Sequence, residues 1–220
     1  NVDHFVDDGD CIAVQFPRTK TNQSASGSLL LHFFAAPHDP SCCIFLEMAI
    51  YFMLLLAGPL NGLIFPGSTT PATGFRAAFK KMFSEDYLKS EYSLTWEKIV
   101  NHSWRKSALS WLSMGSGLKP SQHALDYRAG HSQDWKAKTY YQYIENADYE
   151  IGRAFIAPAG TKEAAALPPH FVLINEDGSE KTTVIEKVLD TARHVFPWYD
   201  TMPLKFQSTL VKLLASAVYH

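Results

Sequence analysis

The residues between 101 and 143 include side chains that could together cleave and rejoin a phosphodiester without a metal ion. A His-x-x-Arg pair, His102 and Arg105, begins a stretch with apolar residues at helical spacing. A Gly-His-Ser sequence at 130–132 follows, and Tyr140 lies nine positions beyond its histidine, His131. An arginine can hold the nonbridging oxygens of a phosphate, histidines can donate hydrogen bonds or move protons, and a tyrosine oxygen can attack phosphorus.

The order and spacing of these residues resemble the catalytic domain of tyrosine recombinases, and most of all that of eukaryotic crypton-type and Flp-like members. The resemblance implies that Tyr140 attacks a DNA phosphate and forms a 3′-phosphotyrosyl bond. It implies that Arg105 and His131 stabilise the phosphorane and that His102 assists proton transfer. It places Lys20, between two predicted strands, as the donor of a proton to the leaving 5′ oxygen.

Two further tyrosines, Tyr141 and Tyr143, are alternatives to Tyr140 as the nucleophile. We favour Tyr140 because a step of nine residues from His131 is the common spacing in the family. Its Thr-Tyr sequence at 139–140 also resembles that of Flp-like members. Tyr141 stays open as the second choice. If the resemblance holds, we expect Arg105, His131 and Tyr140 to converge on one concave basic surface.

The sequence departs from the family in one respect. Tyrosine recombinases have a further arginine in a helix just before the strand at which this sequence begins, and residues 1–10 contain none. Arg18 and Arg76 stand at other places. Either the sequence is a fragment, which its start at Asn1 favours, or an essential group has been lost. We therefore expect an enzyme in full-length form, whereas these 220 residues alone should bind DNA without cleaving it.

Positive charge is concentrated around the candidate catalytic residues. Residues 75–140 contain eleven basic and six acidic residues, although the whole chain has a net charge of -2. Binding to the phosphates of double-stranded DNA requires such a surface, whereas a solvated helical surface would explain the charge without DNA. The candidate contacts to the DNA backbone are Arg76, Lys80, Lys81, Lys106, Lys136 and Lys138.

Composition limits the other function classes. A hydrophobic content of 46% and a charged content of 19% are typical of a folded globular protein. Three cysteines without a Cys-x-x-Cys pair favour a reducing compartment and no zinc site. We expect no cofactor, no small-molecule substrate, no membrane partner, and a nuclear location in a eukaryote (otherwise cytoplasmic). The resemblance implies self-association on DNA.

The predicted fold is mainly α with a small antiparallel β-hairpin near the N-terminus. Strands are expected at 11–16 and 28–34, and residues 144–180 are expected to be rich in loops. We assign residues 1–143 to a recombinase-type catalytic domain that lacks its first helices. Residues 144–220 form a helical extension packed on it or on a neighbouring protomer. Helices are predicted at 41–57, 73–83, 103–114, 121–129, 182–195 and 203–219, with a short one through Trp135.

Two other functions stay open from the sequence. A catalytically inactive DNA-binding protein on the same fold would explain the missing arginine. An unrelated helical interaction domain would make the His-x-x-Arg and Gly-His-Ser patterns a coincidence. The presence of His102, Arg105, His131 and Tyr140 together favours DNA strand cleavage and rejoining, in site-specific recombination or transposon integration.

Overall fold

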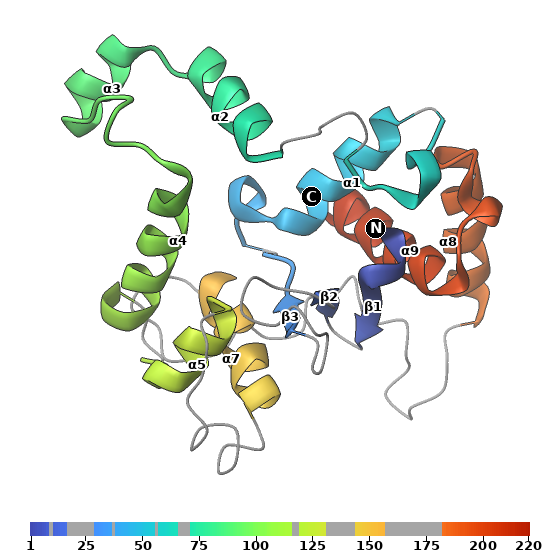
Figure 1. Cartoon of the computed structure of the whole chain (residues 1–220). Helices are drawn as coiled ribbons and strands as arrows, with labels where there is room; N and C mark the ends of the chain where they lie inside the picture. The colour runs from blue at the N-terminus through green and yellow to red at the C-terminus, as the bar shows by residue number, and fades with distance from the viewer. Residues whose placement is uncertain are drawn as a thin grey trace.

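A three-stranded antiparallel sheet lies at the centre of the chain (Figure 1). In this computed structural model the described residues are 1–8, 11–16, 29–36, 38–55, 57–65, 71–115, 119–130, 144–156 and 182–220. The strands are β1 (Phe5–Asp8), β2 (Cys11–Phe16) and β3 (Leu29–Phe33), in the order β1-β2-β3. The hairpin predicted from residues 11–16 and 28–34 is confirmed, with Val14 paired to Leu31. Strand β1 was not predicted.

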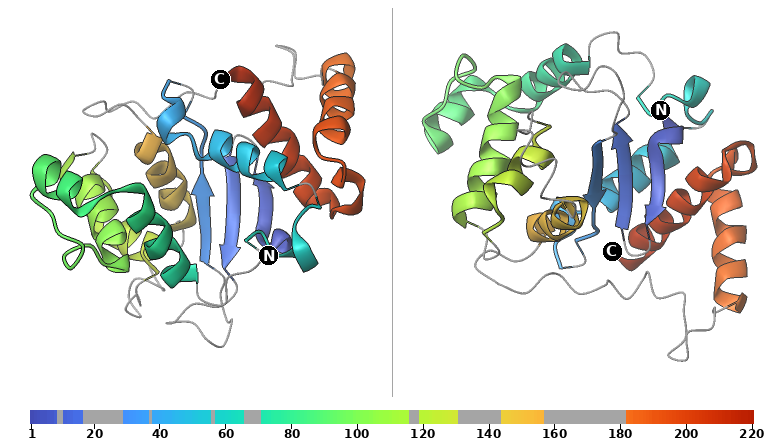
Figure 2. Two further views of the ribbon diagram at one scale, coloured as in Figure 1. Left: turned by 90° about the horizontal axis from the view of Figure 1, so that it is seen from above. Right: turned by 60° about the horizontal axis from the view of Figure 1, so that its bottom comes forward.

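Two helices far apart in sequence, α1 (Ile44–Leu54) and α9 (Leu204–Tyr219), pack against each other and build the main core with the sheet. The ring of Phe206 on α9 contacts Phe5 of β1 and Phe52 of α1 edge to face, with centroids 5.7 and 5.4 Å apart. Helix α8 (Thr182–Val195) packs on α9. Figure 2 shows α8 and α9 at the β1 side of the sheet, with α1 running across the strands.

A second, smaller core lies beside β3. It is formed by α4 (Asn101–Ser110), the π-helical turn Trp111–Gly115, α5 (Gln122–Arg128) and α7 (Ile144–Ile156). Leu112, Leu125 and Ile151 are buried there. The predicted helices at 103–114 and 121–129 are confirmed within a few residues, and Ser121 caps α5 by accepting a hydrogen bond from the backbone of Ala124.

Helix α7 corrects the prediction that residues 144–180 are rich in loops, as far as residue 156. Ala147, Ile151, Ala154 and Phe155 recur at helical spacing and pack in the second core, so burial of this apolar face stabilises the helix. Gly152 lets α7 approach β3 closely, because a Cβ at this position would lie 2.5 Å from the carbonyl oxygen of His32. Residues 157–181 lie outside the described part.

Helices α2 (Pro71–Met82) and α3 (Glu85–Tyr92) project from the two cores on the side of α4 (Figure 1). Phe79 of α2 lies edge to face on Trp104 of α4 and on Trp96, which precedes α4. Helix α3 was not predicted, although Ser84 caps it and Glu85 and Asp86 fill its first turn. This pattern is typical of a helix N-terminus.

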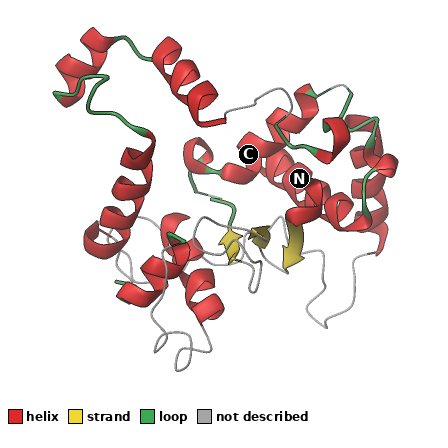
Figure 3. Cartoon of the chain, viewed as in Figure 1, coloured by secondary structure: helices red, strands yellow, loops and turns green. Residues whose placement is uncertain are grey.

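Helices dominate the described part, and the sheet is small (Figure 3). The chain is thus an α+β protein, as predicted. The predicted helices at 182–195 and 203–219 are confirmed, whereas α1 is shorter than the predicted 41–57. The predicted domain boundary falls between residues 143 and 144, where the described part resumes. The division into two domains stays a prediction. Short 3-10 helices occur at Val2–His4, Pro40–Cys42, Leu60–Gly62 and Tyr199–Thr201.

Candidate functional site

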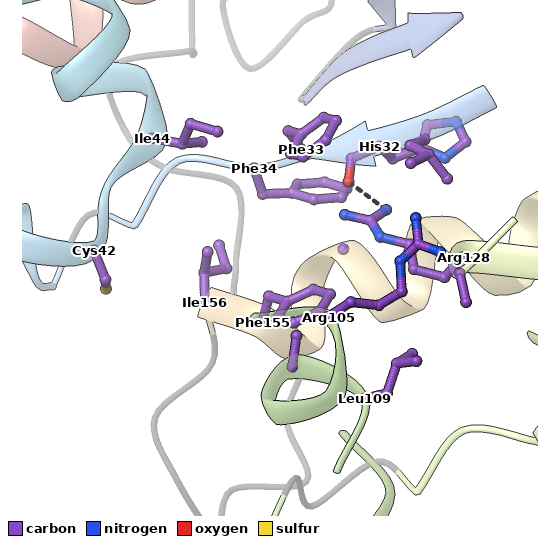
Figure 4. Close-up of a pocket in the computed structure, with 14 residues that line it drawn as sticks. His32, Phe33, Phe34, Cys42, Ile44, Arg105, Leu109, Arg128, Phe155 and Ile156 are labelled. Carbon is purple, nitrogen blue, oxygen red and sulfur yellow. Dashed lines mark hydrogen bonds between the residues drawn. The ribbon is translucent and has the colours of Figure 1, made fainter. Parts of the chain in front are cut away.

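A pocket of about 430 Å³ lies between β3, α4, α5 and α7, beside the start of α1 (Figure 4). Its size falls within the range of sites that hold small ligands or parts of larger ones. Arg105 and Arg128 extend toward the end of the pocket near His32, and Cys42 and Ile44 lie at the other side. The remaining walls are mainly apolar and come from Leu31, Phe33, Phe34, Ala108, Leu109, Phe155 and Ile156.

Arg105 supplies an open guanidinium to this pocket. It lies on α4, its side chain is exposed, and it makes no hydrogen bond or ion pair with another described residue. The start of α4 is fixed by the hydroxyl of Ser103, which accepts the backbone N–H of Val100 at 3.0 Å. His102 lies one turn before Arg105 and is also exposed. Residues three apart share a helix face, so both members of the His-x-x-Arg pair are open to a ligand.

The end of α5 brings the start of the Gly-His-Ser sequence next to the start of β3. Gly130 has a φ of 65°, a left-handed conformation that glycine adopts readily, and its N–H donates to the carbonyl of Tyr127 at 2.9 Å. A Cβ at Gly130 would lie 3.6 Å from the Leu29 side chain. The hydroxyl of Tyr127 also accepts the backbone N–H of Leu30 at 3.2 Å.

Several predicted site residues lie outside the described part of the chain. His131 and Tyr140 belong to this group, so the expected convergence of Arg105 with them stays a prediction. Gly130, the last described residue before His131, lies beside Leu29, the first residue of β3. The full group is Lys20, His131, Lys136, Lys138, Tyr140, Tyr141 and Tyr143, and the expected short helix through Trp135 falls there as well.

A buried ionic network supports the wall of the pocket. Asp148 of α7 is wholly buried, and its carboxylate accepts hydrogen bonds from the backbone N–H of His32 at 2.8 Å and from Arg128 Nη1 at 2.9 and 3.0 Å. His32 Nδ1 lies 3.0 Å from the same carboxylate, within hydrogen-bond distance. His32 Nε2 lies 3.4 Å from Asp8 of β1.

Arg128 is held firmly by this network. Its Nη1 also donates to the carbonyl of His32 at 2.9 Å, and its guanidinium lies over the rings of Phe33 and Phe155, at 4.9 and 5.3 Å from their centroids. An ionic pair taken out of water is stable only when its partners satisfy it with good geometry. Arg128, Asp148 and His32 therefore act as a unit that ties α5 and α7 to β3.

Sequence reasoning missed these three residues as part of the site. One feature of the sequence could have indicated the network. Asp148 is acidic, yet it lies beside Ala147 and Ile151 on the apolar face of α7. A carboxylate on a buried face needs a cationic or N–H partner. The signal predicts that a partner exists, but it does not identify Arg128 or His32, which come from other elements.

Of the four candidate DNA contacts that are described, three are exposed: Lys80, Lys81 and Lys106. Arg76 is half-buried, and its Nη2 donates to the carbonyl of Trp96 at 3.2 Å. Lys80 lies 5.7 Å from the centroid of the Trp96 ring. Arg76 thus also supports the aromatic contacts between α2 and α4, whereas Lys81 and Lys106 have exposed ammonium-bearing side chains.

The cysteines and acidic residues offer little other chemistry in the described part of the chain. All three cysteines are free, and partial burial together with the carboxylate of Asp39 raises the pKa of the Cys42 thiol. Cys42 lines the pocket. Because its pKa is raised, the thiol stays protonated at neutral pH, which disfavours a thiolate nucleophile. Within the described ranges, no three His, Cys, Asp or Glu residues gather as metal ligands, and no helix is long and apolar enough to cross a membrane.

Comparison with known proteins gives no family. No protein-family model matches the sequence, and neither the curated proteins nor the solved structures give a match. A functional assignment must therefore be argued from the residues and the geometry of the pocket.

Proposed function

We propose that this chain is a catalytic domain of the tyrosine recombinase type, which cleaves and rejoins DNA through a 3′-phosphotyrosyl intermediate. The observation that carries the proposal is the position of Arg105. Its open guanidinium lines the same pocket as Ala129, at the end of the helix that leads into Gly130 and His131. Arg105 and the end of α5 come from separate helices and line one pocket, which supports a joint role for the two motifs.

The start of β3 supports the proposal independently. Leu29, its first residue, lies beside Gly130 at the end of α5. Lys20 precedes this strand in the sequence and lies outside the described residues. A phosphoryl-transfer site needs groups from several segments around one phosphate, and the end of α5 lies next to the strand that follows Lys20.

In the proposed reaction the oxygen of Tyr140 attacks a DNA phosphorus, a bond to Tyr140 forms, and the 5′ oxygen leaves. A tyrosine hydroxyl has a pKa of about 10 and is a weak nucleophile at neutral pH, so His102 accepts its proton. Arg105 binds the nonbridging oxygens through its planar fork, and His131 donates to them. Lys20 protonates the leaving oxygen. A second strand's hydroxyl then reverses the step, so the reaction needs neither ATP nor a metal ion.

The test is detection of a covalent adduct between the full-length protein and a nicked DNA duplex. We expect an adduct with the unchanged protein and with Tyr141→Phe, which is the matched control, and none with Tyr140→Phe. Arg105→Gln should reduce the rate of adduct formation by about 10²–10³-fold, because it removes a preorganised donor to the phosphorane. An adduct that persists in Tyr140→Phe would contradict the assignment of the nucleophile.

A second candidate is a DNA-binding protein on the same fold without catalysis. The absence of an arginine from residues 1–10 favours it. This candidate predicts salt-sensitive binding to duplex DNA, no adduct under any condition, and equal binding by Tyr140→Phe and the unchanged protein. The adduct assay therefore separates the two candidates.

A further inference from the structure

Arg128 brings a second guanidinium to the pocket that Arg105 lines. The two side chains come from α5 and α4 and extend toward the same end of the pocket (Figure 4). We propose that Arg105 and Arg128 form a two-arginine clamp for one phosphodiester group, in which Asp148 and His32 are positioning residues that hold Arg128. The choice of a phosphodiester rests on the proposed function, whereas the clamp itself rests on the geometry of the pocket.

The hydrogen bonds of Arg128 leave donors available for a ligand. All of its bonds to described residues use Nη1, which donates to Asp148 and to the carbonyl of His32. Nε and Nη2 make no hydrogen bond to a described residue, and the Arg128 side chain lines the pocket with 10% of its area exposed. An Arg guanidinium has five N–H donors in a rigid plane. Fixing one nitrogen therefore aims the others.

The charges around the pocket favour an anion at this end. Asp148 is wholly buried and compensates the charge of Arg128, but Arg105 has no acidic partner in the described part. Two guanidinium groups that face one pocket repel each other, and an anion between them removes that repulsion. The planar fork of arginine matches two oxygens of a phosphate. A phosphate is therefore the ligand class that this arrangement fits.

The network restricts the Arg128 side chain before a ligand binds. This long side chain would lose conformational freedom on binding a ligand, and Asp148 and His32 restrict it before the ligand arrives. A donor held in place in advance stabilises developing charge without reorganisation. His32 is in turn oriented by Asp148 on one ring nitrogen and by Asp8 on the other. Strand β1 thus helps to hold the His32 ring beside Asp148.

The clamp can be tested by NMR on the 220-residue chain labelled with ¹⁵N-arginine. The probes are inorganic phosphate and a short DNA duplex, each added at constant ionic strength set by sodium chloride. We expect the Nε–H signals of Arg105 and Arg128 to shift together, with the same apparent dissociation constant. Arg153 is an internal control, because it lies on α7 against Phe34 and Tyr149 and does not line the pocket.

The assignments and the positioning role require three variants. Arg105→Lys identifies the Arg105 signal, and contact with the Phe33 ring identifies Arg128 in the unchanged protein. Asp148→Asn keeps the size of the side chain and one acceptor oxygen but removes the charge. We expect the phosphate response of Arg128 to be lost or weakened at least tenfold in Asp148→Asn, while Arg105 still responds. Asp190→Asn on the surface of α8 should change neither response.

Each outcome separates the clamp from the wider proposal. If the signals of Arg105 and Arg128 shift with phosphate and also with DNA, the result supports the clamp and the DNA function. A shift of both with phosphate, but no binding of DNA, supports the clamp and overturns the DNA function. Salt-sensitive DNA binding with an unchanged Arg128 signal overturns the clamp and leaves the DNA function standing. No response of Arg128 to phosphate in the unchanged protein overturns the clamp, and this result does not depend on the folding of any variant.

Discussion

At the scale of single residues, the pocket combines one open arginine with one that the fold has already positioned. Arg105 is exposed on α4, whereas Arg128 is bonded to a carboxylate that is wholly buried. The sequence pattern identified Arg105, because His-x-x-Arg is a local signal. It did not identify Arg128, because its role depends on Asp148 twenty positions later and on His32 in a strand. Long-range ion pairs of this kind have no local sequence signature.

Replacing Asp148 tests the energetic role of the network. Asp148→Ala removes the carboxylate and leaves Arg128 largely buried without a charge partner, so we expect a loss of about 3–5 kcal/mol in the free energy of unfolding. Urea denaturation monitored by circular dichroism measures the loss. Asp190→Ala is the control, because its pair with Arg193 is exposed and should contribute little. Equal stability of the two variants would show that the network is not needed for folding.

Cys42 tests the environment at the far side of the pocket. Its pKa is raised, chiefly by burial and further by Asp39, so less thiolate is present at any given pH near 8 than for an ordinary cysteine. We expect alkylation by iodoacetamide to be slower at pH 8 than for a cysteine in a short peptide, with the rate rising as the pH increases. Cys42→Ser reports the background from the buried Cys11 and Cys43. Alkylation faster than in the peptide would contradict the raised pKa.

At the scale of elements, β3 is the strand that positions the site. Helix α7 packs closely on it, α5 is bonded to it through Tyr127, and the Arg128–Asp148 pair joins both helices to its backbone. Two mainly apolar runs on either side of a segment rich in Ser, Thr, Asn and Gly predicted β2 and β3. Helical spacing of apolar residues predicted α4, and Ser121 as a cap predicted the start of α5. Strand β1 was missed although Gly-Asp at 9–10 is a typical two-residue hairpin connection between short strands. The packing of α7 on β3 depends on Gly152, and its role is visible only in the tertiary structure.

Gly152 tests that packing directly. A Cβ at this position would lie 2.5 Å from the His32 carbonyl and 2.9 Å from the Phe34 ring, so Gly152→Ala must push α7 away from β3. We expect a loss of about 1–3 kcal/mol in the free energy of unfolding, as for other overpacked sites. The same substitution at the exposed Gly74 within α2 should be neutral or stabilising, because alanine favours a helix more than glycine does. A stable Gly152→Ala with unchanged phosphate binding would contradict the close approach.

At the scale of the whole molecule, charge is distributed unevenly along the chain. Residues 75–140 carry the positive excess, and the described part of this segment forms α2 to α5, which include one side of the pocket. The fold class could be predicted because hydrophobic periodicity determines most of the helices. The relative placement of Arg105, Arg128 and β3 could not be predicted, because contacts between distant segments depend on packing that no single segment encodes.

This charge distribution predicts weak, largely sequence-nonspecific DNA binding by the 220-residue chain, with an affinity that falls steeply as salt increases because counterions are released. Lys106→Gln should weaken binding and reduce the salt dependence, since Lys106 is exposed on α4 beside Arg105. Lys205→Gln at the exposed start of α9 should have little effect. Fluorescence anisotropy with a labelled duplex over a series of salt concentrations measures both variants. An affinity that does not depend on salt would remove the case for a DNA partner.

The central claim is that Tyr140 becomes covalently linked to DNA. The most direct measurement is mass spectrometry of peptides from the full-length protein after reaction with a nicked duplex, digestion of the DNA by nuclease, and proteolysis. We expect a peptide in which Tyr140 carries a nucleotide through a 3′-phosphate. We expect the rate at which this peptide forms to fall about 10²–10³-fold when Arg105 is replaced by glutamine. A nucleotide on Tyr141 or Tyr143, or no modified tyrosine under conditions in which the protein binds DNA, would contradict the claim.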